Sequence, residues 1–538
     1  MPTPAAQAQL QQPWKKWIDK LDPKKITENG VVMDANNLSC DSHHGTVALT
    51  PRYDVDLTCD NESGGGSGRT PTSKLDLARD AVQETETEPQ EHDDEIDVTA
   101  LHHRAIDKMF GLNTDFVQAW PGSLIFCIHL EKISLGLIEY KYNVIWKVLG
   151  CEDTPSVEDR WELYFAVLSI ISSLAPEETT INAICLQLAR DKKFPTTSHG
   201  LPQLTELQFD EVRRVVFAVL CWISATLIPT LLRPDTQNSQ VPQELTLPED
   251  WVRNSKHALH QSDYKRPAAK IFRGFRENVI NLHPIGTGSI PSGLAEDTLF
   301  ESGITYISLY RIGNVKLKFV DTIIDHLHFD RKGRTLSLFR FPTFCAMSIL
   351  CTKNLALIES MLLELVLSKT VYPGLHDSKA IHREVLLSYR LLFAQAPKSR
   401  ALIKQYIYRY SRDTGKDIDP FLVALCTTPL SRLRHKMPVA NDLFPDSTLS
   451  IDGEFEESDT YSAMDDFPVF GHRLQLLQRY NLRQQPSKVK DLWRDRRNPL
   501  QWYTFWMVLW VGGAAIIISL LQLAVSAAQL YYSIPQAA

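Results

Sequence analysis

The residues best suited to chemistry in this 538-residue chain lie in one short stretch of alternating polar and apolar side chains. His326, His328 and Asp330 are two positions apart, with Leu327 and Phe329 between them. Alternate residues of a strand project from the same face, so two imidazoles and a carboxylate could together hold a divalent metal ion. The same spacing is also typical of the solvated face of a half-buried strand, with Leu327 and Phe329 inside.

A group of basic residues surrounds this stretch and forms a second candidate site. Clustered positive charge could bind a phosphate or an anionic lipid headgroup, and it would repel a cation at the histidines. The alternatives are a solvated strand face and an intramolecular dock for the acidic segments 84–97 and 442–466. The anion-binding candidates are Lys316, Lys318, Arg331, Lys332, Arg334 and Arg340.

Motifs of the common enzyme and cofactor classes are absent from the sequence. The run GTGSIPSG, residues 286–293, looks like a phosphate-binding loop but lacks the lysine and the Ser or Thr that a nucleotide site needs. Neither HExxH nor GxSxG occurs. Glu384 and Arg390 interrupt an otherwise apolar helical stretch, which favours buried ion pairs with other elements over catalysis. We therefore expect no cofactor, and an activity is not indicated.

These candidates need a small β element to position them. Apolar and polar residues alternate over 314–341, which predicts three short antiparallel strands in a meander. Residues 330–334 supply a turn in which Gly333 suits a positive φ, and Pro342 ends the last strand. The period is helical on both sides of this element. The predicted fold class is therefore mainly α with a small three-stranded antiparallel β element.

Two helical segments carry more specific signals. Ser156 followed by Asp159, and then Arg160 to Leu174 with Pro176 after it, predicts a capped amphipathic helix. Val215 to Leu232 is eighteen residues without a charge, which reaches the lower limit for a membrane-spanning helix. A second span would carry residues 233–497 across the membrane together with their basic cluster, so we interpret this segment as a buried helix.

The C-terminal residues predict a membrane anchor. Asn498 to Ala538 carries no charge, and Trp502 to Tyr531 would span roughly 43 Å as a helix, close to the thickness of a bilayer with its headgroups. Residues 471–497 contain eight basic and two acidic side chains, and positive residues stay cytosolic. We expect a single-pass, tail-anchored protein with a cytosolic N-terminus. The uncharged C-terminal stub favours the endoplasmic reticulum or later secretory membranes over mitochondria.

Small and polar residues recur along this anchor at spacings of three and four. Such a stripe permits close approach of a second helix, either from another copy of the chain or from a partner protein. The alternative is that small residues are common in membrane helices and that the last polar ones lie near the headgroups. The stripe consists of Gly512, Ala515, Ser519, Gln522, Ser526 and Gln529.

Composition narrows the class of protein. A net charge of −7 and a pI near 6.2 argue against a nucleic-acid-binding protein. Nine cysteines without paired spacing fit a reducing compartment. The predicted regions are a mostly disordered acidic and linker region over 1–100, a helical cytosolic domain over 101–437, a disordered acidic tether over 438–468, a basic juxtamembrane helix over 469–498 and the transmembrane anchor over 499–532.

Several segments also resemble recurrent segments of a large group of uncharacterised, C-terminally membrane-anchored proteins of filamentous ascomycete fungi. The resemblance implies an anchored, mostly helical cytosolic protein with a small β element, and it implies no chemistry. The segments are VDTIIDHLHFD (320–330), LSLFRFPTFC (336–345), EVLLSYRLLF (384–393), DLWRDRRNPLQWYTFW (491–506) and RRVVFAVLCWISATLIP (213–229).

Three classes of function follow from these observations. The first is a non-enzymatic adaptor or scaffold that recruits cytosolic partners to a membrane. The second is a membrane-tethered enzyme with an unrecognised site that uses His326, His328 or Arg340. The third is a sensor of anionic lipid headgroups. A pocket lined by converging polar groups favours the enzyme, whereas a basic face directed at the bilayer favours the sensor.

Overall fold

The computed structural model describes most of the chain beyond residue 96, in stretches separated by gaps. The predicted disordered region over 1–100 and the glycine-rich loop over 286–293 lie outside the described residues, apart from 97–100. The described residues are 97–139, 142–151, 155–177, 179–192, 203–229, 243–244, 258–259, 262–273, 298–353, 355–366, 377–436, 441–484 and 499–533.

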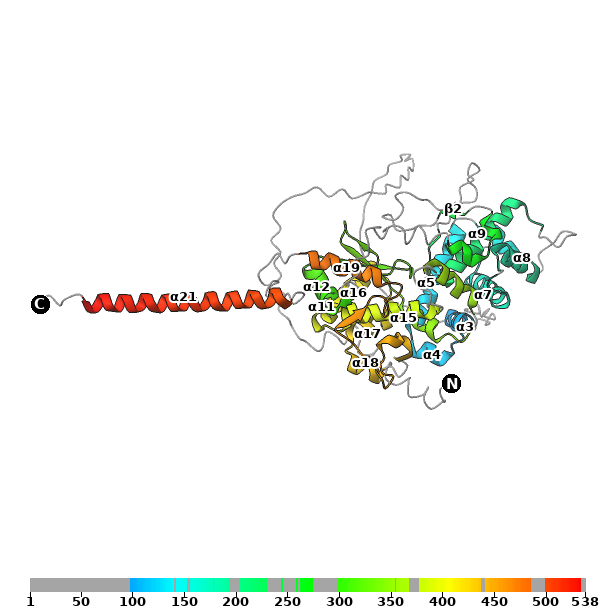
Figure 1. Cartoon of the computed structure of the whole chain (residues 1–538). Coiled ribbons are helices and arrows are strands. Elements are labelled where there is room, and N and C mark those ends of the chain that lie inside the picture. The colour runs from blue at the N-terminus through cyan, green and yellow to red at the C-terminus, as the bar shows by residue number, and fades with distance from the viewer. Residues whose placement is uncertain are drawn as a thin grey trace, which may run out of the picture. The chain divides into compact units, whose positions relative to one another are not determined.

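The first part of the folded chain is a group of mutually packed helices (Figure 1). The capping prediction is confirmed, because the Ser156 hydroxyl accepts from the Asp159 N–H while the Asp159 carboxylate accepts from the Ser156 N–H. The helices are α3 (Val98–Phe110), α4 (Thr114–Ala119), α5 (Gly122–Glu139), α6 (Asn143–Leu149), α7 (Val157–Ser173), α8 (Ile181–Asp191) and α9 (Glu206–Ile223).

The uncharged segment that begins at Val215 belongs to the core of this group. Helix α9 ends at Ile223, and every side chain from Val215 to Ile223 is buried against neighbouring helices. A helix hydrophobic on all sides is expected in such a position. The interpretation as a buried helix is confirmed for the described residues, and residues 230–232 lie outside them.

A three-stranded sheet follows, but its strands are not a meander. Strand β4 (Lys316–Val320) runs parallel to β6 (Thr335–Phe339), while β5 (Phe329–Asp330) pairs with β6 in antiparallel fashion. The strand order is β4-β6-β5, so β6 lies in the centre. The prediction of three antiparallel strands is therefore wrong. A parallel pair requires a connection that crosses over, and residues 321–334, which include β5, supply it.

The connection also explains why the alternating pattern wrongly predicted a strand through His326 and His328. Residues 321–328 form turns instead of a strand, and Leu327 adopts a φ of 60°. This left-handed conformation, unusual for leucine, places His326 and Leu327 both inside. In the next turn the positive φ belongs to Arg334, not to Gly333. Gly333 is required for a different reason, because a Cβ there would lie 2.3 Å from a carboxylate oxygen of Asp330.

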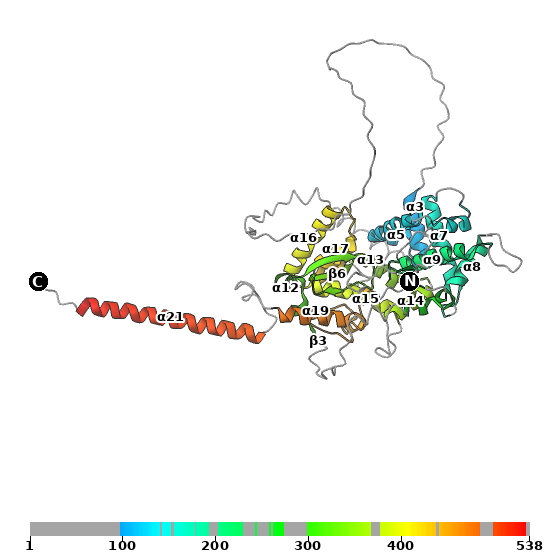
Figure 2. The ribbon, with the colours of Figure 1, turned by 90° about the horizontal axis from the view of Figure 1, so that it is seen from above.

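The sheet is enclosed by helices from the second half of the chain. In the view of Figure 2, β6 lies between α16 and α19. Phe319 on β4 contacts Tyr406 and Tyr410 of α16, and Phe329 on β5 contacts Tyr480 of α19. The helices and the helical turn of this part of the chain are α11 (Glu301–Ile304), α12 (Tyr306–Arg311), α13 (Pro342–Leu350), α14 (Ala356–Val366), α15 (Ser378–Tyr389), the π-helical turn η4 (Arg390–Ala394), α16 (Pro397–Thr414), α17 (Pro420–Thr427), α18 (Leu430–Lys436) and α19 (Gly471–Arg483).

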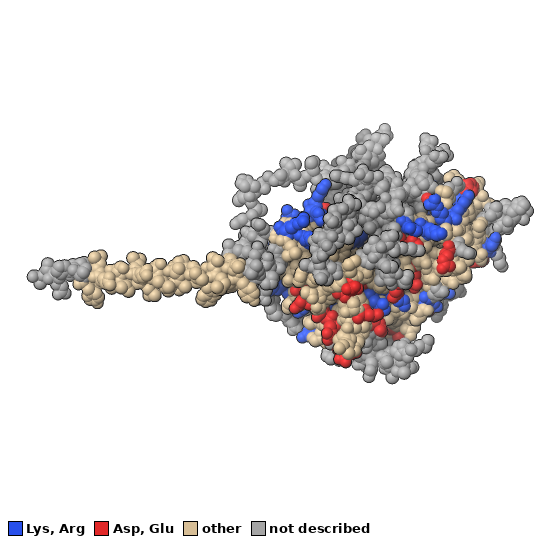
Figure 3. All heavy atoms as spheres, in the orientation of Figure 1, with Lys and Arg blue, Asp and Glu red and all other residues tan. Residues whose placement is uncertain are grey.

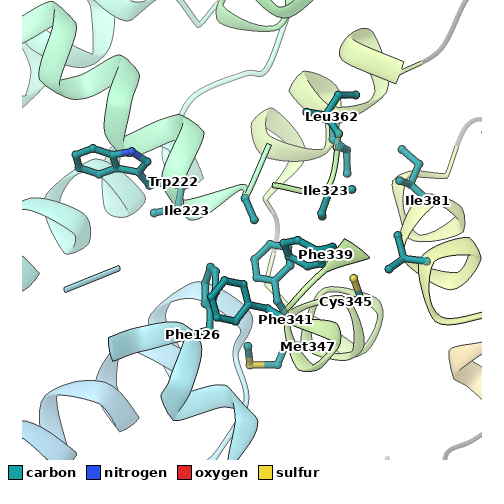
Figure 4. Packing of buried hydrophobic residues seen from close by; sticks show 14 of the residues in the cluster. Phe126, Trp222, Ile223, Ile323, Phe339, Phe341, Cys345, Met347, Leu362 and Ile381 are labelled. Atoms are coloured by element: carbon teal, nitrogen blue, oxygen red, sulfur yellow. The ribbon is translucent and has the colours of Figure 1, made fainter. Parts of the chain in front are cut away.

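One apolar core joins both parts. Figure 4 shows Phe126 of α5 beside Phe341, with Phe339 of β6 and Cys345 of α13 close by. The Phe126 and Phe341 ring centroids are 5.6 Å apart in an edge-to-face arrangement. Short elements complete the described chain: β1 (Gln243–Glu244), β2 (Ala258–Leu259), η2 (Asp263–Lys265), β3 (Thr298–Phe300), η5 (Asn441–Leu443), η6 (Asp446–Thr448) and β7 (Thr460–Ser462).

The acidic segment, residues 441–468, is ordered and packed, so the prediction of a disordered tether is wrong for these residues. Strand β7 pairs antiparallel with β3, and Phe444 stacks on Phe455 with ring centroids 3.9 Å apart. Arg390 explains the ordering. Its guanidinium is fully buried and donates to the Glu457 carboxylate at 2.6 and 2.8 Å. It also donates to the carbonyls of Leu425 and Thr428.

Glu384 binds the end of the same segment. Its buried carboxylate accepts from the N–H groups of Val469 and Phe470, at 3.0 and 2.8 Å, where α19 begins. Burial raises the pKa of Glu384, and these hydrogen bonds oppose the rise. The expectation of buried ion pairs with other elements is confirmed for Arg390, whereas the Glu384 carboxylate binds backbone N–H groups instead. Helix α19 is thereby part of the folded domain, with Leu474 and Leu477 buried, and residues 485–498 lie outside the described chain.

The last helix, α21 (Pro499–Ser533), has the properties predicted for the anchor. Within it, Tyr503–Tyr532 is the one stretch in the described part of the chain that is long and apolar enough to cross a membrane, and none of it is buried against protein. The structure therefore agrees with a mainly helical fold, a small sheet and one C-terminal apolar helix.

The pairing of Arg390 yields a first prediction. Glu457→Ala leaves a buried guanidinium without its counterion, which costs about 3 kcal/mol or more. We expect this loss in urea unfolding of the full chain in detergent, together with faster proteolysis within residues 441–468. Glu456→Ala, at the exposed neighbouring position, is the matched control and should change little. Equal stability of the two variants would contradict the role of Arg390.

Candidate functional site

His326 lies in the interior, where both ring nitrogens have protein partners. Nδ1 accepts from the Phe339 N–H at 3.2 Å, and Nε2 lies 2.8 Å from the Ser388 hydroxyl oxygen. The Ser388 hydroxyl itself donates to the Val385 carbonyl, so Nε2 must be the donor in its bond to Ser388. The imidazole is therefore a neutral Nε2–H tautomer, fixed between β6 and α15.

Burial lowers the pKa of His326 to about 3, and the nearby Arg473 guanidinium lowers it further. Arg473 of α19 donates to the carbonyls of Ile324 and His326, at 2.6 and 2.5 Å. Three elements thus meet around one imidazole. The arrangement is a structural junction, and neither ring nitrogen is left to bind a metal or a substrate.

The metal candidate His326, His328 and Asp330 is not brought together. Asp330 lies in the turn, where its carboxylate accepts from the N–H groups of Lys332 and Gly333, both at 2.8 Å. No group of three or more His, Cys, Asp or Glu side chains in the described chain could hold a metal ion. The three side chains do not converge because residues 326–328 are not in a strand, so the period of two does not apply to them.

Arg340 is likewise not part of an exposed anion site. It is buried beside Asp321, with which it forms an ion pair, and its guanidinium lies 4.2 Å from the centroid of the Phe341 ring. It also donates to Nδ1 of His129 at 3.0 Å. Burial, opposed by Asp321 and assisted by Arg340, lowers the pKa of His129 to about 4. Arg340 therefore leaves the predicted anion-binding set.

The other five basic candidates are exposed and lie on neighbouring parts of one sheet. The N–H of Lys316 donates to the Arg334 carbonyl, which joins the start of β4 to the turn between β5 and β6. Figure 3 shows a group of basic side chains near this sheet, apart from acidic side chains lower on the same face. Among the residues that the structure describes, none forms an ion pair with any of the five. We name the set Lys316, Lys318, Arg331, Lys332 and Arg334 the basic sheet end.

The acidic segment is held elsewhere, so it does not act as a free competitor for these charges. Glu457 is paired with Arg390, and the Asp466 carboxylate accepts from the Ser462 N–H at 2.8 Å. The other proposed competitor, residues 84–97, lies outside the described chain apart from Asp97. Asp97 caps α3 through the N–H groups of Thr99 and Ala100.

The helix-packing stripe follows one side of α21. Nothing lies within 4 Å of a Cβ built at Gly512, and the Ser519 hydroxyl donates to the Ala515 carbonyl one turn earlier. Gln522, Ser526 and Gln529 continue the stripe at exposed positions. Self-association through these residues stays a prediction.

Sequence reasoning missed His382, which lines an apolar cavity among helices of both halves of the domain. The sequence contains sixteen histidines, and nothing in its local pattern sets His382 apart from the others. Only the placement of α15 against helices far away in the sequence creates this cavity.

No family model matches the chain, and neither a curated protein nor a solved structure matches it.

The titration of His326 yields a second prediction. Its pKa is near 6.5 in the unfolded chain and about 3 in the folded one, so the unfolded state takes up the extra proton as pH falls between these values. The stability contributed by the neutral imidazole is complete above pH 7, and roughly 2 kcal/mol of it is lost by about pH 5.

His326→Gln keeps an N–H donor but cannot titrate. We expect the variant to be less stable than the natural protein at pH 7.5, with a gap that narrows by roughly 2 kcal/mol at about pH 5. Urea unfolding in detergent at the two pH values measures this difference. The other histidines titrate in both proteins, so their contributions to the difference in stability cancel. A gap independent of pH would show that His326 is not buried as a neutral ring.

Proposed function

We propose that the protein is a single-pass membrane-anchored adaptor whose folded domain lies on the cytosolic side. In this proposal the basic sheet end contacts anionic lipid headgroups, and the remaining surface is available to cytosolic partners. The observation that carries it is the placement of five exposed basic side chains on one rigid sheet, in a chain that also carries an apolar, unburied α21.

The anchor supports the first half of the proposal. Tyr503 marks one end of the apolar stretch of α21, and Tyr531 and Tyr532 mark the other. Aromatic residues at both ends are typical of a helix that meets both interfaces of a bilayer. Five basic residues lie between Lys488 and Arg497. Because positive residues stay cytosolic, this asymmetry favours a cytosolic folded domain.

The rigidity of the sheet supports the second half. The Tyr406 hydroxyl of α16 donates to the Leu317 carbonyl of β4 at 2.7 Å, and Phe319 packs on Tyr410. The turn at Arg331 is fixed by Asp330 through two backbone N–H groups. The basic side chains therefore extend from a fixed backbone. Binding to an anionic surface then costs conformational entropy of the side chains but not of the backbone.

Edge protection is the structural alternative for two of these residues. Strand β4 is at the edge of its sheet, and lysines on an edge strand discourage pairing with another chain. This explanation covers Lys316 and Lys318. It does not cover Arg331, Lys332 and Arg334, which lie in the turn.

The chain length between domain and anchor makes the contact feasible. Helix α19 ends at Arg483 and α21 begins at Pro499, so fifteen residues join them. Fully extended, they span at most about 50 Å. Since Tyr480 of α19 contacts Phe329 of β5, the connecting chain leaves the domain near the same sheet that carries the basic residues.

The adaptor interpretation is favoured over the enzyme because the side chains proposed for an enzyme have structural partners. His326 is fixed by Ser388 and Phe339, and Arg340 by Asp321. Membership of the fungal group of anchored proteins, a location in the endoplasmic reticulum or later membranes, and association through the α21 stripe belong to the same proposal.

Lysine footprinting tests the membrane contact in the full chain. The protein is reconstituted into nanodiscs of phosphatidylcholine alone or with about one third phosphatidylserine, and exposed lysines are acetylated with a water-soluble reagent. Each basic residue near an anionic surface contributes about 1 kcal/mol, so the labelling of Lys316, Lys318 and Lys332 should slow about fivefold or more at low salt. The difference should vanish at high salt, where the Debye length falls to about 3 Å.

Lys147, exposed on α6, is the internal reference and should label at the same rate in both discs. Arg331→Ser with Arg334→Ser should weaken the protection. The matched control is Lys108→Ser with Arg190→Ser, which removes two exposed charges from α3 and α8. Equal labelling of the sheet lysines in neutral and anionic discs would leave edge protection as the explanation.

A further inference from the structure

Helix α19 runs alongside β5 toward the basic sheet end. Near the start of α19, Arg473 donates to the carbonyl of His326, which lies just before β5. About two turns later, the Tyr480 ring contacts Phe329 of β5, with ring centroids 4.7 Å apart. The helix and the strand therefore advance in the same direction. Because β5 ends at the turn that belongs to the basic sheet end, α19 also ends beside that turn.

Helix α12 ends in the same place. The Tyr480 hydroxyl donates at 2.9 Å to the carbonyl of Gly313, in the loop that joins α12 to β4. The neighbouring Asn481 donates through Nδ2 to the Gly303 carbonyl and to Oγ of Ser308 in α12, at 2.7 and 2.9 Å. Figures 1 and 2 show α12 next to α19 in both views. The ends of two helices thus lie beside the first residues of β4, which belong to the basic sheet end.

These helix ends extend the positive charge of the sheet. Arg311 is the last residue of α12, and Arg479 and Arg483 lie in the last turns of α19, all three exposed. Neither α12, β4 nor α19 contains an Asp or Glu. Asp330 is the acidic residue of the adjoining turn, and its carboxylate accepts from two N–H groups of that turn. The chain as a whole carries a net charge of −7, so this end of the domain has the opposite sign to the chain.

Two large side chains lie exposed among these charges. Leu482, in the last turn of α19, is 47% exposed, although Leu474 and Leu477 of the same helix are buried. Tyr310, next to Arg311, is also 47% exposed. A single exposed leucine is ordinary on the surface of a soluble protein. Leucine and tyrosine together with arginine are typical of a segment in the headgroup region, where the apolar groups enter the lipid and the cations stay at the phosphates. We name these five residues the helix-end patch: Tyr310, Arg311, Arg479, Leu482 and Arg483.

The connection to the anchor indicates what covers this patch. Arg483 is the last residue of α19, and fifteen residues lead from it to α21. Since they span at most about 50 Å, the membrane that holds α21 is always within reach of the patch. Five of the fifteen are basic. Anionic headgroups complement the charge of the patch, and the lipid chains beneath them complement its apolar side chains.

We propose that the helix-end patch docks into the anionic membrane that holds α21, with Leu482 and Tyr310 inserted among the lipid headgroups and the three arginines at the phosphates. This inference rests on the proposed function, because the helix-end patch and the basic sheet end then face one membrane. The proposed function requires electrostatic attraction alone. Docking of the patch also buries apolar side chains in lipid, and it determines which end of the domain faces the bilayer.

Photocrosslinking in the full chain tests the insertion. The photoreactive amino acid p-benzoylphenylalanine is placed at position 482, and the protein is reconstituted into nanodiscs of phosphatidylcholine alone or with about one third phosphatidylserine. A tritiated phosphatidylcholine tracer, present in both discs, counts the lipid adducts formed on irradiation. We expect about fivefold more adducts in the anionic discs at low salt, and no difference between the discs at high salt. The neutral discs control for closeness to the anchor, because the tether is the same in both.

Leu135 of α5 is the matched control position, because it is a leucine with 42% exposure on the other helical group. The photoreactive residue placed there should give the same low level of adducts in both discs. Arg311→Ser with Arg483→Ser should lower the adducts formed at position 482 in anionic discs. Lys108→Ser with Arg190→Ser, which removes two charges elsewhere, should leave them unchanged.

Leu482→Ser measures the apolar contribution without a crosslinker. Burial of the exposed half of a leucine side chain changes an equilibrium constant about fivefold. The variant should therefore move the labelling of Lys316 and Lys318 in anionic discs toward its rate in neutral discs. Leu135→Ser is the matched control and should leave the protection of these lysines unchanged. Thermal unfolding confirms that both variants are folded.

Two results would overturn the docking of the helix-end patch and leave the proposed function intact. If the sheet lysines are protected but position 482 gives no more adducts than position 135, the contact is electrostatic only. If position 482 gives equal adducts in neutral and anionic discs, the tether alone brings it to the lipid. Absence of lysine protection in anionic discs would instead contradict the proposed function, so the two proposals fail by different measurements.

Discussion

The buried guanidinium of Arg390 is the constraint on which much of the fold depends. A charge with no exposure to solvent must be paired, and its counterion Glu457 comes from the acidic segment 67 residues later. Glu384, one and a half turns earlier, binds the backbone where that segment ends. The segment is thus fixed at Glu457 by Arg390 and at its end by Glu384. Helix α19 begins there and covers β5, so the same two side chains also fix the sheet that carries the basic residues.

What could be predicted from the sequence is what depends on local or bulk properties. The cap at Ser156 works within one helical turn, and α21 follows from hydrocarbon thickness and the absence of charge. Burial of α9 was predicted because its uncharged run only reaches the lower length limit for a membrane span. A second span would also carry the basic cluster across the membrane. Each of these features is decided by residues close together in the chain, or by the membrane itself.

The features that were missed depend on contacts between distant residues. The acidic composition of 441–468 predicted disorder because composition considers only the residues of the segment itself. The buried cation that pairs with the segment, Arg390, lies outside it. The parallel pairing of β4 with β6 depends on the turns of 321–328 and on Leu327 at positive φ, which no propensity favours. The interior position of His326 and the cavity at His382 arise from helix packing. A polar residue in the pattern therefore indicated a possible site but not its environment.

In the proposed function, the anchor and the basic sheet end act together on one membrane. Five basic residues at about 1 kcal/mol each give about 5 kcal/mol, which corresponds to a dissociation constant of about 0.2 mM, too weak to hold a free domain on a membrane. A tether of fifteen residues raises the effective concentration of the surface to the order of millimolar. In the proposed arrangement, contact is then the majority state, and it remains sensitive to lipid charge and salt. A permanent anchor with a weak second contact can therefore change the orientation of the domain without releasing it.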